Sequence, residues 1–145
     1  MANSEGSARA VPPPLPSAEL KDLVVVSESP LARVCVMELN SPKANVLTAD
    51  LMTRLLAAVK DVCDPDSEQR AHGIILTSKI PGIFSGGLDI KEMLRYSSQE
   101  QFLYNWNLFQ SLFVTLHSLP VPLAVAINGH AAAGGTVVAL GADYQ

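Results

Sequence analysis

Phe84-Ser85-Gly86-Gly87-Leu88-Asp89-Ile90 follows a short apolar segment and leads into an expected helix at Ile90. Two adjacent glycines at such a point let the backbone approach a ligand closely, or adopt a positive φ, without steric cost. Amide groups at a helix N-terminus have no partner within the helix and carry partial positive charge. The stretch therefore predicts a backbone site that receives developing negative charge.

A second stretch, Ile127 to Thr136, repeats this arrangement of strand, small residues and a helix that begins at a glycine pair. Three functions are compatible with such an arrangement. A nucleotide P-loop would fit the spacing from Gly129 to Thr136, but Gly135 stands where the phosphate-binding lysine belongs. A dinucleotide fingerprint is disfavoured because the chain contains no G-x-G-x-x-G. The third interpretation combines both stretches.

In this third interpretation, two strand-to-helix turns form one oxyanion hole. Gly86 is predicted to supply one amide and Gly134, at its helix N-terminus, the other. Both would point at a single carbonyl oxygen and need no reorganisation as charge develops there. Tight packing between helix and strand is the alternative explanation for each glycine.

Length and composition limit the classes of protein that this chain can represent. Its 145 residues and 48% hydrophobic content fit one globular domain with a buried core. The formal charge of −4 comes without a basic cluster, so no nucleic-acid partner is expected. No apolar run is long enough to span a membrane. Cys35 and Cys63 lie far apart on apolar segments and are predicted to be core thiols, with no metal site.

The first twenty residues form a separate region rich in Ala, Ser and Pro. Residues 1–20 are predicted to be a disordered tail or a targeting segment, because the prolines exclude regular structure. Residues 21–145 are predicted to be the folded domain.

Alternation of strands and helices predicts an α/β fold with parallel βαβ units. Strands are expected at 23–26, 34–39, 73–77 and 123–127, with a turn at Asn128-Gly129. Helices are expected from Thr48, as N-cap, to Asp64, and from Gly134 to Leu140. Ser97-x-x-Glu100 predicts a capping box for a long helix that reaches about Ser118.

Aromatic and aliphatic side chains recur along that long helix at steps of three and four residues. Phe102, Trp106, Phe109, Phe113 and Leu116 therefore share one face. This face is predicted to be core or a helix–helix seam, and a wall of a ligand site is the alternative.

Several motifs in order, 73–77, 84–90 and 126–135, resemble the crotonase (enoyl-CoA hydratase/isomerase) superfamily. Ser41-Pro42-Lys43-Ala44-Asn45-Val46-Leu47 is similar to the family's loop beside the CoA site. Within the superfamily, the F-S-x-G-L-D and I-N-G-x-x-x-A-G-G versions are most similar to the mitochondrial Δ3,Δ2-enoyl-CoA isomerases. The resemblance implies the crotonase-like ββα spiral fold over residues 21–145.

The resemblance also implies the site residues. The amides of Gly86 and Gly134 would hold the thioester oxygen, and no cofactor is implied beyond the CoA of the substrate. Asp89 is predicted mainly to cap the following helix, and His130 to be a packed surface or core histidine, with contact to the ligand as the alternative. The residues implied to line the acyl-CoA site are Lys43, Ala44, Asn45, Ser85, Gly86, Gly87, Leu88, Asp89, Ile90 and Gly134.

The implied chemistry is a double-bond shift in an enoyl-CoA, as in fatty-acid β-oxidation, through an enolate stabilised by the two amides. Hydratases of the family carry a glutamate at the position of Val137, so hydration is disfavoured. The family's other catalytic glutamate is implied about twenty residues beyond Gly134.

That position lies beyond Gln145, so the chain is expected to be the N-terminal half of a crotonase-like domain. It would be truncated before the C-terminal helical region and have little or no activity. The full-length form would be a homotrimer that acts on an acyl-CoA thioester in mitochondria, with peroxisomes or cytoplasm as alternatives. A non-catalytic fragment that binds acyl-CoA or a partner protein is the other hypothesis.

Overall fold

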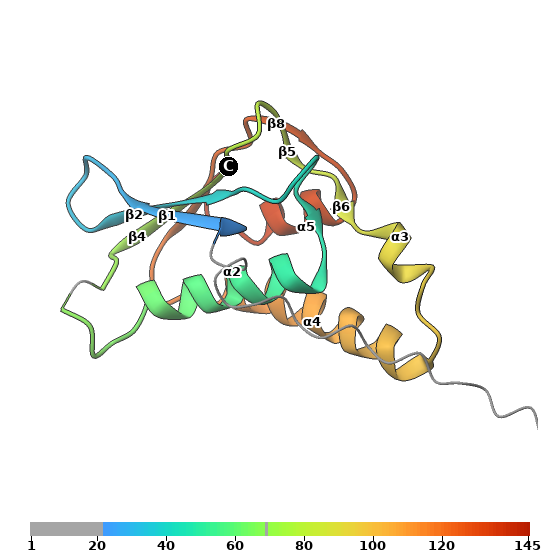
Figure 1. Ribbon diagram of the computed structural model, residues 1–145. Helices are drawn as coiled ribbons and strands as arrows, with labels where there is room; N and C mark the ends of the chain where they lie inside the picture. The colour runs from blue at the N-terminus through green and yellow to red at the C-terminus, as the bar shows by residue number, and fades with distance from the viewer. Residues whose placement is uncertain (1–21, 69) are drawn as a thin grey trace, which may run out of the picture.

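The computed structural model describes residues 22–68 and 70–145, and Figure 1 shows their arrangement. The predicted tail or targeting segment at 1–20 lies outside these residues. The described chain forms a mixed α/β structure, as expected from the alternation of strands and helices.

The main sheet has four strands in the order β1 (Val24–Glu28), β2 (Val34–Leu39), β4 (Gly73–Ser78) and β7 (Leu123–Val125). Strand β1 pairs antiparallel with β2, whereas β2, β4 and β7 run parallel. Helices occupy both crossovers between the parallel strands. The four strands predicted from β-branched runs are thus confirmed, along with the parallel βαβ units.

Two short parallel pairs lie beside the main sheet. Strand β3 (Val46–Leu47) pairs with β6 (Gly87–Leu88), and β5 (Gly82–Ser85) pairs with β8 (Gly129–Ala131). The turn predicted at Asn128-Gly129 is therefore wrong at its second residue, where β8 begins. Gly129 allows this pairing because a Cβ built on it would lie 2.0 Å from the carbonyl carbon of Gly82.

Helix α2 (Ala49–Val62) begins where the sequence predicted. The Oγ1 of Thr48 accepts a hydrogen bond from the amide of Leu51, which satisfies one of the unpaired N-terminal donors. The helix buries one face, formed by Leu51, Met52, Leu55, Ala58 and Val59. This face packs toward the main sheet.

Helices α3 (Ile90–Met93) and α4 (Gln99–His117) follow the first glycine turn. The N-cap of α4 is Ser98, whose Oγ accepts from the amide of Gln101, so the capping box predicted at Ser97 is displaced by one residue. Gln101 Oε1 in turn accepts from the Ser97 amide. Ser98-x-x-Gln101 fits the sequence pattern of a capping box, in which Gln can replace Glu, but Gln101 bonds the amide of Ser97 and not that of the N-cap Ser98.

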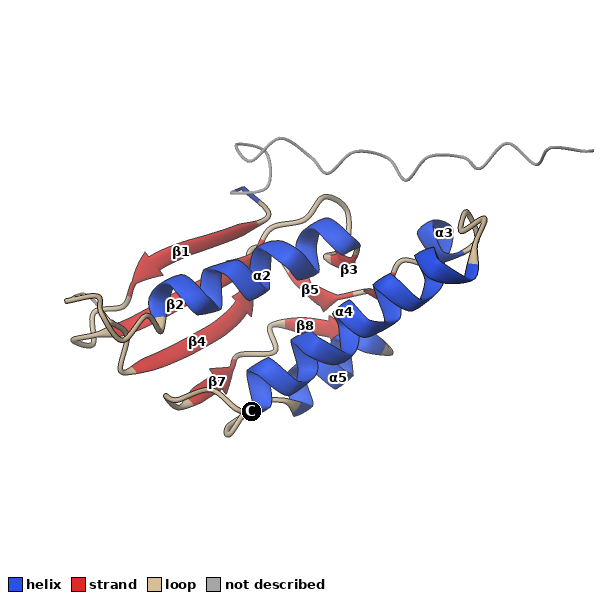
Figure 2. Cartoon of the chain, turned by 90° about the horizontal axis from the view of Figure 1, so that it is seen from below, coloured by secondary structure: helices blue, strands red, loops and turns tan. Residues whose placement is uncertain are grey.

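Helices α2 and α4 lie on the same side of the main sheet, below its strands in Figure 1, and Figure 2 shows α2 in front of β2. Helix α5 (Gly134–Leu140) begins at the second glycine turn and packs against β5, β6 and β8. Between these layers lies the core, whose largest fully buried side chains include Met37, Leu55 and Phe84. Cys35 and Cys63 are free thiols that pack against this core, as predicted.

Candidate functional site

A buried polar network holds the first glycine turn against the loop at 41–45. The Asn45 side chain accepts from the Ser41 amide at 2.7 Å and donates to Ser78 Oγ at 2.7 Å and to the Phe84 carbonyl at 3.0 Å. Ser85 Oγ donates to the Asn45 carbonyl at 2.7 Å. Loop 41–45, the end of β4 and the end of β5 are therefore fixed to one another by side chains.

The side chains of Asn45 and Ser85, two residues predicted to line the acyl-CoA site, lie within this buried network. Both are 0% exposed, and their polar groups are used within the network. A buried polar group with its hydrogen bonds made is inaccessible to a ligand without breaking them. These two residues position the turn instead.

Gly86 was predicted to donate one oxyanion-hole amide, and the structure contradicts this. Its amide donates to the Ala44 carbonyl at 2.8 Å, although the residue itself is exposed. A carbonyl at that distance occupies the place of a ligand oxygen. The Gly86 amide is therefore not free to bind a ligand oxygen.

The backbone nitrogen of Leu88 lies beside the second turn. A Cβ built on Gly134 would lie 3.2 Å from the Leu88 nitrogen, and one built on Gly87 would lie 3.0 Å from the Gly134 nitrogen. As the first residue of α5, Gly134 has no carbonyl within the helix to which its amide can donate. The amides of Leu88 and Gly134 therefore lie close together. Gly134 lies at the N-terminus of its helix, as predicted.

Close backbone packing holds the second turn in position. Gly87 has φ +82°, and an added Cβ would lie 2.7 Å from the Ala132 carbonyl oxygen. An added Cβ at Gly135 would lie 2.8 Å from the Ser85 carbonyl oxygen. Ala133, the N-cap of α5, has φ 43° and ψ −111°, a region that only glycine adopts without strain.

The remaining predicted residues surround this amide pair. Lys43 is exposed with φ 74°, and Ala44 is half-buried beside Gly86. Asp89 caps α3, since its Oδ1 accepts from the amides of Lys91 and Glu92. The capping role predicted for Asp89 is confirmed.

Two other residues near the turns lie at the surface. Ile90 is 69% exposed, at the start of α3. His130, predicted to be a packed histidine, is also exposed. It lies in β8, opposite Ile83 of β5.

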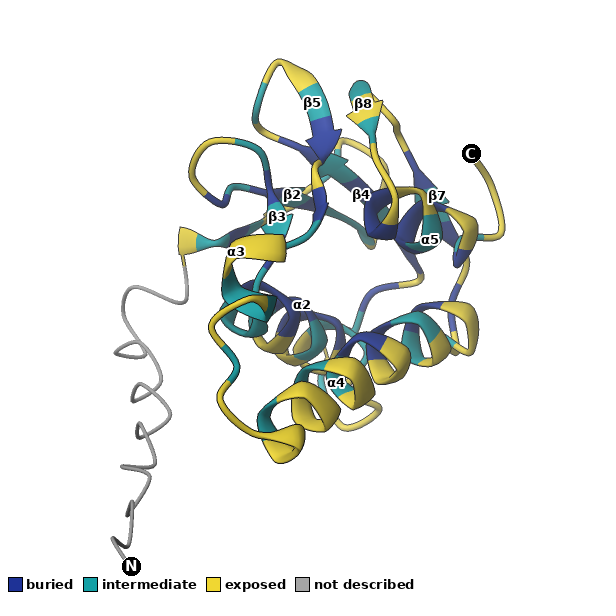
Figure 3. Ribbon diagram, turned by 90° about the vertical axis from the view of Figure 1, so that its right-hand side faces the viewer, coloured by how far each residue is buried: buried dark blue, intermediate teal, exposed yellow. Residues whose placement is uncertain are grey.

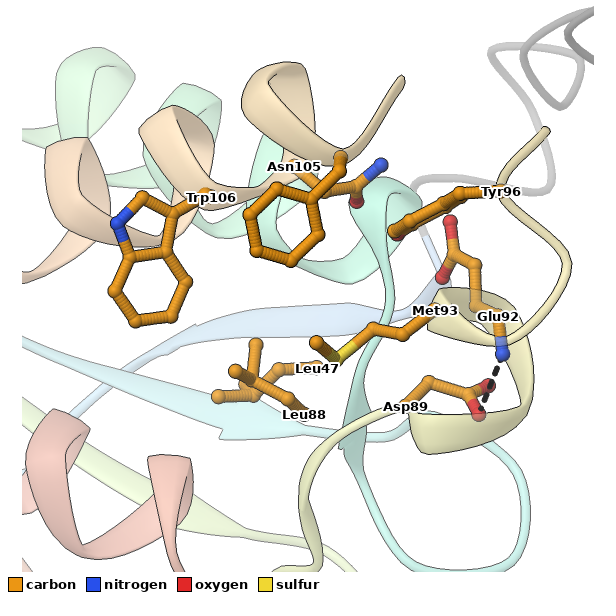
Figure 4. A pocket seen from close by; sticks show the side chains of 9 residues that line it. Leu47, Leu88, Asp89, Glu92, Met93, Tyr96, Asn105 and Trp106 are labelled. Atoms are coloured by element: carbon orange, nitrogen blue, oxygen red, sulfur yellow. Dashed lines mark hydrogen bonds between the residues drawn. The ribbon is translucent and has the colours of Figure 1, made fainter. Parts of the chain in front are cut away.

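A narrow hollow opens between α3, α4 and the β3–β6 pair (Figure 4). Leu88 belongs to both the amide pair and the hollow. Its backbone nitrogen lies beside Gly134, and the same residue lines the hollow. The other residues that line the hollow are Leu47, Asp89, Glu92, Met93, Tyr96, Phe102, Asn105 and Trp106.

The aromatic face predicted on α4 divides into two parts. Phe109 and Leu116 are buried in the core, as the main interpretation predicted. Phe102 and Trp106 remain 42% and 41% exposed, and their rings stack with centroids 6.3 Å apart where they line the hollow. Figure 3 shows the change from buried to exposed residues along the helix. The alternative interpretation, a wall of a ligand site, therefore fits the N-terminal half of α4.

Two titratable groups in the hollow have shifted pKa values. Burial raises the pKa of the Glu92 carboxyl, and the nearby charges of Asp89 and Asp50 add to this effect. The Ala49 amide, which hydrogen-bonds Glu92, and the Arg95 charge oppose it. Burial, with Glu92 and Asp89, raises the pKa of Tyr96 to about 12. The hollow therefore favours uncharged groups.

Sequence reasoning missed the place of the Leu88 amide beside Gly134 and the residues that line the hollow from α3. The one signal for the hollow was the aromatic face of α4, because Glu92, Met93 and Tyr96 follow no periodic pattern. Among the described residues, no group of three or more His, Cys, Asp or Glu is placed to hold a metal ion. None of the described helices is long and apolar enough to cross a membrane.

Residues 31–145 match the family model described as enoyl-CoA hydratase/isomerase. The chain is 36% identical over 125 residues to mitochondrial enoyl-CoA delta isomerase 1 of Mus musculus. The aligned region covers 86% of this chain and 42% of the relative. The chain is also 36% identical over 122 residues to the Homo sapiens protein of the same name, covering 84% of this chain and 39% of that protein. The chain thus spans less than half the length of these relatives.

Solved structures show the same fold. The crystal structure of human mitochondrial Δ3-Δ2-enoyl-CoA isomerase has a TM-score of 0.77 and 35% identity, covering 84% of this chain and 46% of that one. An enoyl-CoA hydratase/isomerase family protein from Pseudomonas syringae has a TM-score of 0.73 and 34% identity, covering 86% of this chain and 50% of that one. The fold is therefore the crotonase fold, and the chain belongs to the enoyl-CoA hydratase/isomerase family.

Proposed function

We propose that the amides of Leu88 and Gly134 bind the thioester oxygen of an enoyl-CoA, in a protein that shifts the double bond of its substrate. The observation behind this proposal is the approach of the Leu88 nitrogen to within 3.2 Å of a Cβ position on Gly134. Two convergent amides beside a helix N-terminus stabilise an enolate oxygen as its charge develops. Removal of a proton next to the thioester then becomes easier.

The hollow supplies the place for the acyl group. Since Leu88 contributes both to the amide pair and to the hollow, a thioester oxygen held by its amide directs the adjacent acyl carbons toward Phe102 and Trp106. These apolar rings favour an apolar chain. The exposed loop at Lys43 lies beside the first turn and would flank the CoA part.

Isomerisation is favoured over hydration because of the residue at 137. The resemblance places a hydratase glutamate there, whereas Val137 is an apolar residue packed against the core. Hydration stays the second candidate, since methylglutaconyl-CoA hydratase of Mus musculus is 34% identical over 101 residues. We propose a mitochondrial location from the names of the mouse and human isomerases.

Gly134→Ala tests the amide pair directly. The added methyl would lie 3.2 Å from the Leu88 nitrogen, in the space that the thioester oxygen needs. Binding of a saturated acyl-CoA can be followed by the fluorescence of Trp106, the only tryptophan of the chain. We expect binding to weaken by about fivefold, since the loss of one hydrogen bond costs about 1 kcal/mol.

Gly73→Ala is the matched control, because an added Cβ there lies 3.8 Å from its nearest neighbours. It should bind like the wild type. Equal binding by the Gly134→Ala protein would reject the amide pair. Conversion of a 3-enoyl-CoA to the conjugated 2-enoyl-CoA, followed by absorbance, then separates isomerisation from hydration, which would give a hydroxyacyl-CoA.

A further inference from the structure

The peptide group between Ser85 and Gly86 is held at both of its ends. Its carbonyl oxygen, on Ser85, accepts from the Ala132 amide of the second turn at 2.9 Å. Its amide, on Gly86, donates to the Ala44 carbonyl of loop 41–45 at 2.8 Å. One peptide group therefore joins the loop beside the first turn to the residues that precede α5.

The Ser85 hydroxyl extends this restraint to the next peptide group of the first turn. Its Oγ accepts from the Gly87 amide at 3.2 Å and donates to the Asn45 carbonyl at 2.7 Å. A hydroxyl can do both at once, because it carries one donor and two acceptor sites. Glycine populates a wide range of φ, so a bond to the Gly87 amide restricts the backbone at that point. The next amide along the chain is that of Leu88, which lies beside Gly134.

Ser85 also lies against the start of α5. A Cβ built on Gly135 would lie 2.8 Å from both the Cβ and the carbonyl oxygen of Ser85, and 3.1 Å from its Oγ. Ser85 itself is fully buried. Since Gly135 follows Gly134 and Gly87 precedes Leu88, Ser85 contacts the backbone next to each of the two amides.

We propose that Ser85 is a positioning residue that fixes the distance and direction between the Leu88 and Gly134 amides. Its hydroxyl orients the first amide through Gly87, and its carbonyl and Cβ set how close the second turn lies. Two donors stabilise one oxygen only where both are aimed at it, so a small displacement of either weakens the pair. The effect on a thioester rests on the proposed function, whereas the coupling between the two turns does not.

Ser85→Ala removes the hydroxyl and leaves the carbonyl acceptor of Ala132 in place. The Gly87 amide and the Asn45 carbonyl then lose the group that joins them. We expect a saturated acyl-CoA to bind about fivefold more weakly, the effect of one lost hydrogen bond to its oxygen. Ser85→Cys keeps a weak donor and acceptor at the same place and should give a smaller loss.

Ser78→Ala is the matched control. Ser78 is also buried, and its Oγ accepts from the Asn45 side chain at 2.7 Å and from the Ile80 amide at 3.0 Å. These hydrogen bonds belong to the same network, but none of them joins a residue of either glycine turn. Ser78→Ala should therefore lower stability, as Ser85→Ala does, without moving the Leu88 or Gly134 amide.

The measurement is the stretching frequency of an isotope-labelled thioester carbonyl, in an acyl-CoA bound to the 145-residue chain, by infrared difference spectroscopy. Hydrogen bonds draw charge onto the oxygen and lower this frequency. The lowering should shrink in Ser85→Ala and persist in Ser78→Ala. An equal frequency in the wild type and Ser85→Ala, or an equal loss in both variants, would overturn the proposal.

Hydrogen exchange in the ligand-free chain separates the coupling from the proposed function. The Ala132 amide keeps its own acceptor in Ser85→Ala, yet it should exchange about fivefold faster if the hydroxyl couples the turns. In Ser78→Ala its exchange should stay as in the wild type. Unchanged exchange at Ala132 in Ser85→Ala would refute the coupling. If the wild type binds no acyl-CoA but Ala132 responds to Ser85 alone, the proposed function fails and the coupling stands.

Discussion

The two glycine turns hold their amides in place by opposite means. Side chains fix the first turn, since Asn45 and Ser85 join it to its neighbours through buried hydrogen bonds. The second turn is held mainly by the lack of side chains, since Gly129 and Gly135 let backbone approach backbone more closely than any Cβ permits. The side chains of Asn128 and Thr136 add hydrogen bonds to the Ser78 and Ala131 carbonyls.

This difference separates two requirements of the proposed oxyanion site, the orientation of its amides and the distance between them. Hydrogen bonds from buried side chains define the orientation of the first turn, because each unmade bond carries a large penalty. Close packing defines the distance between the turns, because the repulsion energy between two atoms rises steeply as they approach each other. Gly87 takes part in both turns, because it lies in the first turn and packs closely against the backbone of the second.

Gly87→Ala should break the contact between the turns and have the largest effect. The change adds the cost of a positive φ to a contact of 2.7 Å with the Ala132 carbonyl oxygen. We expect the free energy of unfolding to fall by about 4 kcal/mol, from overpacking and backbone strain together. Denaturant unfolding measures this change.

Gly82→Ala provides the matched comparison. Gly82 has a similar φ of +76°, but an added Cβ would meet nothing within 4 Å. Only the backbone strain should appear, at about 1 kcal/mol. Equal losses in the two variants would show that the close approach contributes nothing to stability.

Asn45→Ala should disrupt the side-chain network of the first turn. It leaves the buried Ser41 amide without its acceptor at 2.7 Å and removes two donated hydrogen bonds. It also places alanine at φ 46°. The free energy of unfolding should fall by about 2 to 3 kcal/mol.

The control for this network is Asn40→Ala. Asn40 makes one exposed side-chain hydrogen bond, to the Asp22 carbonyl. Its loss should cost below about 0.5 kcal/mol. A loss at Asn45 no larger than that at Asn40 would contradict a structural role for the network.

Sequence patterns predicted the elements that bury continuous apolar surface. The four long strands and α2 follow from β-branched runs and from the spacing of Leu51, Leu55 and Val59. The glycine pairs predicted that two turns meet, and Gly134 does lie at the meeting point. These features depend on local preference and periodicity.

Pairing between distant residues could not be predicted in the same way. Which amide of the first turn stays accessible depends on the Ala44 carbonyl, a partner forty-two residues away from Gly86 in sequence. From the sequence alone, Asn45 is a loop residue that could lie near a ligand. In the structure its side chain is buried and donates hydrogen bonds to Ser78 and Phe84. The hollow likewise depends on how α3 packs beside α4.

Ala133→Gly should sharpen the second turn and give the smallest effect, in the opposite direction. The wild-type residue has φ 43° and ψ −111°, where a Cβ is strained, and it has no side-chain cap bond to lose. Relief of strain should raise the free energy of unfolding by about 1 kcal/mol, partly offset by the greater freedom of glycine in the unfolded chain. Thermal and denaturant unfolding measure this gain. Ala132→Gly, at the neighbouring exposed position without a positive φ, should instead lower stability. If both variants lose stability alike, the second turn holds its backbone without strain, and close packing alone accounts for its geometry.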